Sequence, residues 1–364
     1  MHLSLVSSLD SQCRQEATAR LAGSHPDSVV VHHDLLEGSV VLRRIFRDGQ
    51  LVERAENTLE HGCLSCTVRL DVIPTVQRLL DSGSSNVVLG LPPGVPTGQV
   101  AAGIAAGLGR QVKVENAVLA LDPVELEDQI WDRHSLFESG FTSTPEDGRT
   151  SGEFLVGEFA HVDTVLTHHG LGASLAGLLR GDGADTTGWS AGVDLLSQLA
   201  PHAAVVGGED EFRPNCYDPR EAAARSRPGD VRVPLRTQAG DFRTVTHAVG
   251  RPLHPKRFQE ALPQLAAGSH WLRGRLWMAS APTERIGLTG VGPLIWLENT
   301  GHWSAGDASD ADALQGWRPD FGHRSTVVAV TGRKEDVQAR EVRDLLDGCQ
   351  LTPKEMKRKM EGQR

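Results

Sequence analysis

Short apolar runs and helical spacings alternate along the first half of the chain. Residues 3–6 (LSLV) and 28–32 (SVVVH) are compact and apolar, as strands are, and residues 38–46 alternate well enough for a third strand. Residues 15–21 and 73–80 instead space their apolar side chains as one face of a helix. We therefore expect strands to alternate with helices along this part of the chain.

Continuous apolar runs follow. Asn86–Leu91 (NVVLGL) has the pattern of a strand buried on both faces of a parallel sheet, and Ala117–Leu121 and Thr164–Thr167 are further predicted strands. Residues 139–152 form a polar loop between them. Because strands alternate with helical patterns, this half of the chain predicts a doubly wound, mostly parallel α/β sheet.

The pattern of apolar and polar residues changes after residues 213–234. This stretch is rich in Pro and Arg, and we interpret it as a linker. Beyond it we expect a smaller α+β domain in which two helices pack on a sheet. The domains predicted are an α/β domain over 1–235, the smaller domain over 241–356 and a basic tail over 357–364. The second-domain strands are predicted at Phe242–Ala248, Arg275–Ala279, Leu294–Glu298 and Thr326–Thr331, and its helices at Pro255–Leu265 and Val337–Leu346.

Charge and hydropathy exclude several classes of protein. Of 364 residues, 37 are Lys or Arg and 47 are Asp or Glu, which gives a net charge of −10. Binding to the phosphate backbone needs clustered cations, so no DNA partner is expected. No apolar run is long enough to span a membrane, and the N-terminus lacks the pattern of a secretory signal. We expect a cytoplasmic protein with no membrane partner.

Cysteine usage points to a candidate metal site. The chain has 5 cysteines, an odd number that argues against a disulfide framework. Cys63 and Cys66 are spaced C-x-x-C, so their thiolates can bind one Zn²⁺, and structural zinc sites add two more N or S ligands. His61 is the first additional candidate. The others are Glu60 and the adjacent pairs His32/His33 and His168/His169, although neighbours on a strand point to opposite sides and rarely bind one ion together.

Two other interpretations of Cys63 and Cys66 stay open. A redox dithiol is one, but the Trp and Pro that accompany thioredoxin-like motifs are missing. Two thiols retained for packing are the other. No Ser-His-Asp pattern, catalytic carboxylate pair or dinucleotide fingerprint is present.

Separated motifs resemble the CobW-like family, P-loop GTPases that act as metallochaperones. Glu60–Arg69 (EHGCLSCTVR) is similar to that family's E-N-G-C-x-C-C-T-[LV]-R segment, with Ser65 where the family has a third cysteine. Arg251–Phe258 (RPLHPKRF) and Leu272–Ala279 (LRGRLWMA) resemble the start of its C-terminal domain, followed by Gly301-His302-Trp303. Thr331-Gly332 and Leu345–Thr352 (LLDGCQLT) resemble its end. The resemblance implies a P-loop-GTPase-like sheet domain followed by a CobW-type C-terminal domain.

The nucleotide motifs of that family are degenerate in this chain. Ser8–Gln15 (SLDSQCRQ) stands in place of G-x-x-G-x-G-K-[ST], without the glycines and lysine that cradle phosphates, and Asp10 would repel a triphosphate. Pro92-Pro93-Gly94 replaces the acidic residue and [ST]-G, and Thr167–Gly170 replaces the guanine-reading N-K-x-D. We therefore expect no GTP binding, no catalytic residues and no enzymatic activity.

An actinobacterial subgroup of these proteins has the same combination of features. It shares an H-G-C-x-S-C-T-[IV]-R segment, the lack of a P-loop, and a D-G-R-T sequence before E-F-A, here Asp147–Thr150 and Glu158–Ala160. This resemblance implies a non-catalytic adaptor, made when zinc is scarce, that recruits the hibernation-promoting factor to the ribosome. The alternative implied by the wider family is a zinc metallochaperone that delivers zinc to client proteins, with or without GTP hydrolysis.

Other chemically interesting residues have plainer interpretations. His254 precedes a predicted helix and is expected to be structural, and Glu298 has no partner acid at a readable spacing. A solvated helix end is the simpler interpretation of the basic tail, and contact with rRNA is the alternative. The tail cations are Lys354, Lys357, Arg358, Lys359 and Arg364. Late tryptophans could supply a contact surface, with Trp277 expected in the core; the others are Trp271, Trp296, Trp303 and Trp317.

Overall fold

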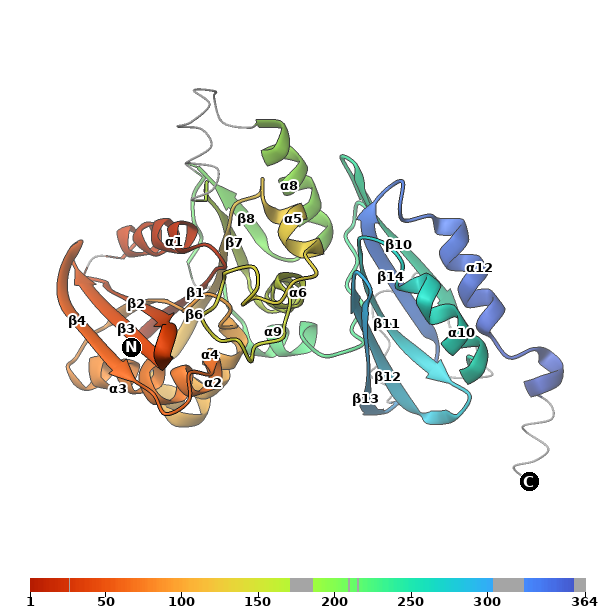
Figure 1. Cartoon of the computed structure of the whole chain (residues 1–364), viewed down its shortest axis with the longest axis horizontal. Helices are drawn as coiled ribbons and strands as arrows, with labels where there is room; N and C mark the ends of the chain where they lie inside the picture. Colours follow the sequence, from red (N-terminus) through yellow and green to blue (C-terminus); the bar gives the residue numbers. More distant parts are fainter. Residues whose placement is uncertain (26, 171–185, 209, 215, 304–323, 357–364) are drawn as a thin grey trace. The chain divides into compact units, whose positions relative to one another are not determined.

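The computed structural model describes residues 1–25, 27–170, 186–208, 210–214, 216–303 and 324–356. Its backbone divides into two units. The first comprises Met1–Leu196 and His202–Ala223, and the second comprises Ser197–Pro201 and the described residues from Ala224 onward. Each unit is built on one sheet with helices packed against it (Figure 1).

An eight-stranded sheet forms the first unit, in the order β4-β3-β2-β5-β1-β6-β7-β8. From β2 to β8 neighbouring strands are parallel, whereas β3 and β4 run antiparallel at one edge. The strands are β1 (His2–Ser7), β2 (Val29–Leu36), β3 (Val40–Arg47), β4 (Gln50–Thr58), β5 (Asn86–Gly90), β6 (Lys113–Leu121), β7 (Thr164–Thr167) and β8 (Ala204–Gly207).

Helices cover both faces of this sheet because its central strands are apolar on both sides. On one face α1 packs Cys13, Ala17 and Leu21 against strand residues such as Val88 and Val118. The opposite face carries α2 to α4 (Figure 1). The helices are α1 (Ser11–Gly23), α2 (Leu64–Thr67), the π-helical η2 (Val68–Val72), α3 (Ile73–Asp81), α4 (Thr97–Gly107), α5 (Leu126–Trp131), α6 (Ser151–His161), α8 (Thr186–Leu199) and α9 (Pro219–Arg225), with short 3₁₀ turns η1 (Glu37–Ser39) and η3 (Gly109–Gln111).

The second unit contains a six-stranded antiparallel sheet in the order β13-β12-β11-β14-β10-β9. Helices α10 and α12 pack together over one face, where Phe258 and Leu346 meet Leu272, Leu276 and other strand residues. The elements are β9 (Gln238–Ala239), β10 (Phe242–Val249), α10 (Pro255–Leu265), β11 (His270–Met278), β12 (Ala281–Val291), β13 (Leu294–His302), β14 (Thr326–Arg333) and α12 (Ala339–Cys349).

The predicted fold class is confirmed: an α/β domain with a largely parallel sheet precedes a smaller α+β domain. Four of the described strands, β4, β8, β9 and β12, were not predicted. The β3–β4 hairpin turns at Asp48 and Gly49, whose φ angles of 50° and 74° suit a tight two-residue turn, but the polar β4 hides the strand pattern. The proline and glycines of β12 hide it in the same way, and β8 is short. The predicted linker contains α9. No helix among the described residues has the length and apolarity needed to cross a bilayer.

Candidate functional site

Only three residues, Ser8 to Asp10, connect β1 to α1; we call this connection the junction. Asp10 caps α1, because its Oδ1 accepts the N–H of Cys13 at 2.8 Å. The hydroxyl of Ser8 donates to the carbonyl of Ala120 at 2.7 Å. One N–H at the start of α1, that of Cys13, is thus occupied by a side chain of the chain itself.

Side chains and backbone pack closely on the junction. The N–H of Gly170 donates to Asp122 at 2.8 Å, and a Cβ at Gly170 would lie 3.0 Å from Oδ2 of Asp10. The thiol of Cys13 lies 3.5 Å from the carbonyl oxygen of His168. Burial and the nearby Asp10 raise the pKa of the Cys13 thiol well above its usual range. These contacts close the end of β1 with acidic and neutral groups.

Arg14 is the sole cation in Ser8–Gln15, and its side chain is fully buried. The guanidinium donates to the carbonyls of His33 at 3.0 Å and Leu91 at 2.7 Å, and to the carboxylate of Asp34. Its charge is therefore directed into the sheet and is used to join α1 to β2 and to the end of β5.

The loop after β5 is fixed by two residues that the sequence analysis did not assign a role. Glu158 accepts the N–H of Thr97 at 3.0 Å, the hydroxyl of Thr97 at 2.9 Å, and the hydroxyl of Ser7. Burial raises the pKa of Glu158 to about 7. Arg149 donates to the carbonyl of Gly94 at 2.9 Å. Arg149 lies in the D-G-R-T motif and Glu158 in the E-F-A motif, so these two motifs are the sequence feature that could have identified them.

The C-x-x-C residues form a turn, Cys63–Cys66, that we call the thiol turn. Cys63 immediately precedes α2 in an extended conformation, and its sulfur accepts the N–H of Cys66 at 3.2 Å. Both side chains are half-buried. The hydrogen bond between the thiols lowers the pKa of Cys63 and raises that of Cys66. The lowered pKa of Cys63 favours its thiolate, which is the form that binds metals.

Of the predicted ligand set, the fold brings together only the two cysteines. No group of three or more His, Cys, Asp or Glu side chains suited to a metal occurs within the described parts of the chain. His61 and Glu60 are exposed beside the turn. His32 and His33 point to opposite faces of β2, as predicted: His32 contacts Thr18 of α1, and His33 contacts Asp71. The second predicted histidine pair, His168/His169, follows β7, and the ring of His169 lies 4.6 Å from that of Trp189.

A buried carboxylate holds the segment that follows the thiol turn. Asp71, in η2, accepts both contacts from Nη1 of Arg43, at 2.9 and 3.0 Å, and a hydrogen bond from Asn57. Nε2 of His33 lies 3.0 Å from the same carboxylate. Although burial opposes ionisation, the hydrogen bonds from His33, Asn57 and Arg43 lower the pKa of Asp71 to about 2. η2 is thus tied to β2, β3 and β4 by a charged network.

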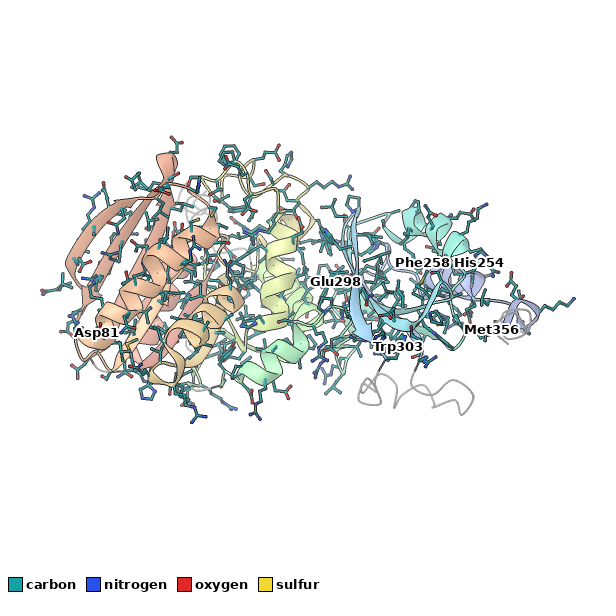
Figure 2. The ribbon with its side chains drawn as sticks, turned by 90° about the horizontal axis from the view of Figure 1, so that it is seen from below. Asp81, His254, Phe258, Glu298, Trp303 and Met356 are labelled. Atoms are coloured by element: carbon teal, nitrogen blue, oxygen red, sulfur yellow. The ribbon has the colours of Figure 1, made fainter. Side chains whose placement is uncertain are left out.

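Two further candidates, His254 and Glu298, lie in the second unit (Figure 2). His254 caps α10, where Nδ1 faces the N–H of Arg257 at 3.5 Å, one turn from Phe258; its predicted structural role is confirmed. Glu298 lies on the exposed edge strand β13.

The late tryptophans that the structure describes do not all lie on the surface. Trp277 is buried, as expected, and Trp271 is also buried, with the guanidinium of Arg273 3.9 Å from its ring centre. Trp296 is exposed and Trp303 is half-buried, while Trp317 lies outside the described residues. Of the tail cations, Lys354 is exposed; Lys357, Arg358, Lys359 and Arg364 also lie outside the described residues.

Comparisons with known proteins agree with part of the predicted resemblance. Residues 242–350 match the family described as the cobalamin synthesis protein cobW C-terminal domain, which confirms the expected type of the second domain. The chain is 27% identical over 338 residues to the zinc chaperone Rv0106 of Mycobacterium tuberculosis, and this match covers 83% of this chain and 77% of that protein. The uncharacterized protein Mb0109 of Mycobacterium bovis matches to the same extent.

Solved structures with zinc are more distant. The Zn(II)-bound YjiA GTPase from E. coli is 12% identical, with a TM-score of 0.38, and the match covers 96% of this chain and 99% of that one. A Zn(II)-bound triple mutant of YjiA GTPase gives a TM-score of 0.37 over the same shares.

Proposed function

We propose that this chain is a zinc-handling protein of the CobW type, which binds Zn²⁺ through Cys63 and Cys66 and passes it to a client protein. The observation that carries the proposal is the thiol turn, in which two half-buried cysteines lie within one helical turn and the Sγ of Cys63 caps α2. The cobW-type C-terminal domain and the similarity to a protein named as a zinc chaperone support it.

An incomplete ligand set suits transfer better than storage. Zn²⁺ in a closed structural site has four protein ligands, whereas the thiol turn supplies two and the described residues add no third. Two coordination positions therefore remain for water or for ligands of a client. A client with three or four ligands would hold the ion more tightly, so the metal would move toward it.

We further propose that this handling does not use GTP. At the junction the carboxylate of Asp10 accepts one of the N–H groups at the start of α1, and the side chain of Arg14 is directed into the sheet. A triphosphate would meet the charge of Asp10 without a compensating lysine. The residues present do not fit a nucleoside triphosphate, and we therefore assign no catalytic step.

Metal analysis of three proteins tests the zinc proposal. We expect one Zn²⁺ per chain in the wild type and in Cys216→Ser, an exposed cysteine outside the turn, and none in Cys63→Ser/Cys66→Ser. Equal zinc in all three would refute the assignment. In parallel, equilibrium binding with labelled GTP and Mg²⁺ should give no saturable signal, and micromolar binding would refute GTP independence.

A second function is favoured by the same closed junction. A chaperone without a nucleotide switch lacks the usual means of controlling release, whereas a non-catalytic adaptor needs none. With a net charge of −10, the chain would attract a basic ribosome-binding protein such as the hibernation-promoting factor. Zinc on the thiol turn would then shift the chain toward one of two binding states.

The two functions differ in their partners. A pull-down from zinc-starved cells, with and without added zinc, distinguishes them. Recovery of ribosomes and the hibernation factor only without zinc supports the adaptor. Recovery of a zinc enzyme without ribosomal proteins supports the chaperone.

A further inference from the structure

Strand β4 forms the outer edge of the first sheet (Figure 1). Its inner side pairs antiparallel with β3, and no strand among the described residues pairs with its outer side. All but two of its 9 residues are exposed. Such an edge presents a row of backbone N–H and C=O groups without partners, which is a template for pairing with another strand.

The hydrogen-bond pattern fixes which residues of β4 direct their backbone groups outward. Just beyond the strand, the N–H of Leu59 donates to the carbonyl of Ser39 at 2.9 Å, in line with the register of β3 and β4. Hydrogen-bonded and non-hydrogen-bonded pairs alternate along an antiparallel ladder. The odd-numbered residues of this stretch therefore bond to β3, and the backbone groups of Arg54, Glu56 and Thr58 face outward.

The charges on β4 favour one register when the strand pairs with a second copy of itself. A two-fold axis perpendicular to the sheet makes this pairing antiparallel. With the axis at Ala55, Arg54 of each copy stands opposite Glu56 of the other, and both residues have outward-facing backbone groups. An axis at Arg54 or at Glu56 would place like charges directly opposite each other, which destabilises a pair of strands.

The other face of β4 is compatible with the same axis. Ala55 would stand opposite Ala55 in a non-hydrogen-bonded pair, where the strands approach most closely, and its side chain is small enough for that approach. Glu53 would stand opposite Asn57, a carboxylate facing an amide. Arg43 at 3.1 Å and Arg78 at 2.6 Å already neutralise Glu53 within the chain, so it adds no repulsion.

Arg54 and Glu56 also pair within one chain. Nη2 of Arg54 donates to Oε1 of Glu56 at 2.7 Å, and both side chains are more than half exposed. Two copies joined at Ala55 would bring two such pairs together, with four charges alternating in sign. A network of this kind stabilises more than an isolated surface pair does.

We propose that β4 is a self-association edge, at which two copies of this chain join their first sheets into one continuous sheet about a two-fold axis at Ala55. Both β4 edges are used in this arrangement, so association through them stops at the dimer. Because pairing of two edge strands buries less surface than a standard interface, the dimer should be weak, with a dissociation constant on the order of 100 µM.

Sedimentation velocity of the full chain across a concentration series tests the charge register. EDTA is present so that zinc cannot bridge the thiol turns of two copies. Arg54→Glu and Glu56→Arg each create like-charged cross-strand pairs and should weaken the dimer on the order of tenfold. The double variant Arg54→Glu/Glu56→Arg restores opposite charges in the same register and should associate as the wild type does. Both side chains are exposed, so the fold tolerates these changes.

A cross-link locates the axis. In a chain carrying Cys63→Ser, Cys66→Ser and Cys216→Ser, which removes the cysteines that are not buried, Ala55→Cys places two thiols across the axis. Their Cα atoms would lie about 4.5 Å apart, within the span of a disulfide, so mild oxidation should give a covalent dimer. The control is Gln50→Cys, exposed on the same strand, whose two copies would lie about 30 Å apart.

Three results would each overturn the proposal. The first is a wild-type chain that stays monomeric at concentrations around the expected dissociation constant. The second is a double charge-reversal variant that associates no better than the single variants. The third is a Gln50→Cys chain that cross-links as readily as the Ala55→Cys chain.

Discussion

The junction and the thiol turn both lie beside helix N-termini of the first unit, but their polar atoms are used differently. At the junction, Asp10 and Ser8 form hydrogen bonds with the chain's own backbone. The guanidinium of Arg14 donates to a backbone carbonyl at the end of a sheet strand. At the thiol turn, the Sγ of Cys63 also accepts a backbone N–H, that of Cys66, but both cysteine side chains stay half-exposed. Polar groups that are bonded within the chain stabilise the fold but are not available to a ligand. Polar groups that stay accessible stabilise the fold less but can bind one.

The largest expected effect comes from the base of the thiol turn. Asp71→Ala leaves Arg43, whose side chain is 12% exposed, without its buried partner. Removing one member of a buried ion pair costs about 3–5 kcal/mol, which urea unfolding would measure. Zinc binding should weaken as well, because η2 directly follows α2. The control is Arg54→Ala, in an exposed pair with Glu56, where about 0.5 kcal/mol is expected. Equal losses would contradict the anchoring role.

Beneath the junction, Glu158 should make stability depend on pH. Its folded pKa of about 7 exceeds the ordinary 4.5, so the folded state binds more protons between these values. Stability therefore falls as pH rises from about 4.5 to 7, by roughly 3 kcal/mol for this group. Glu158→Gln should remove that part of the decline and be more stable than the wild type at pH 8. Parallel unfolding curves at pH 5 and pH 8 would contradict this.

A smaller effect is expected when the junction itself is opened. Asp10→Ala removes the cap of α1 and should cost about 1 kcal/mol in thermal or urea unfolding. Labelled GTP should still not bind, because no lysine or glycine-rich loop replaces the lost carboxylate. Tight GTP binding by the variant would mean that Asp10 alone blocks a working nucleotide site.

The smallest expected effect on stability is at the thiol turn. Cys63→Ser keeps an acceptor ahead of α2, so unfolding should change by less than about 0.5 kcal/mol. Zinc binding should nevertheless be lost, since serine is a poor zinc ligand. A stability loss as large as that of Asp71→Ala would place the cysteines in the structural base instead of the metal site.

Much of the fold was predictable because local patterns and tertiary structure agree. The helix Pro255–Leu265 and the strand Thr164–Thr167 have the predicted bounds, since both combine clear apolar spacing with clear ends. Strand β4 was missed because its side chains are largely exposed at the sheet edge and follow no apolar pattern. Trp271 was misplaced because sequence cannot tell that Arg273 and the sheet cover it.

The sequence by itself indicated the alternation of strands and helices in the first unit, the C-x-x-C spacing and the lack of a P-loop motif, because each depends on residues close together along the chain. Tertiary structure alone decided which polar side-chain atoms have a hydrogen-bond partner and which have none. The pairing of His33 with Asp71 and the unused Nδ1 of His32 follow from strands and helices far apart in sequence. Burial removes water from these atoms, so each depends on the residue beside it for a hydrogen bond. The result is an altered pKa in some groups and an unpaired donor or acceptor in others.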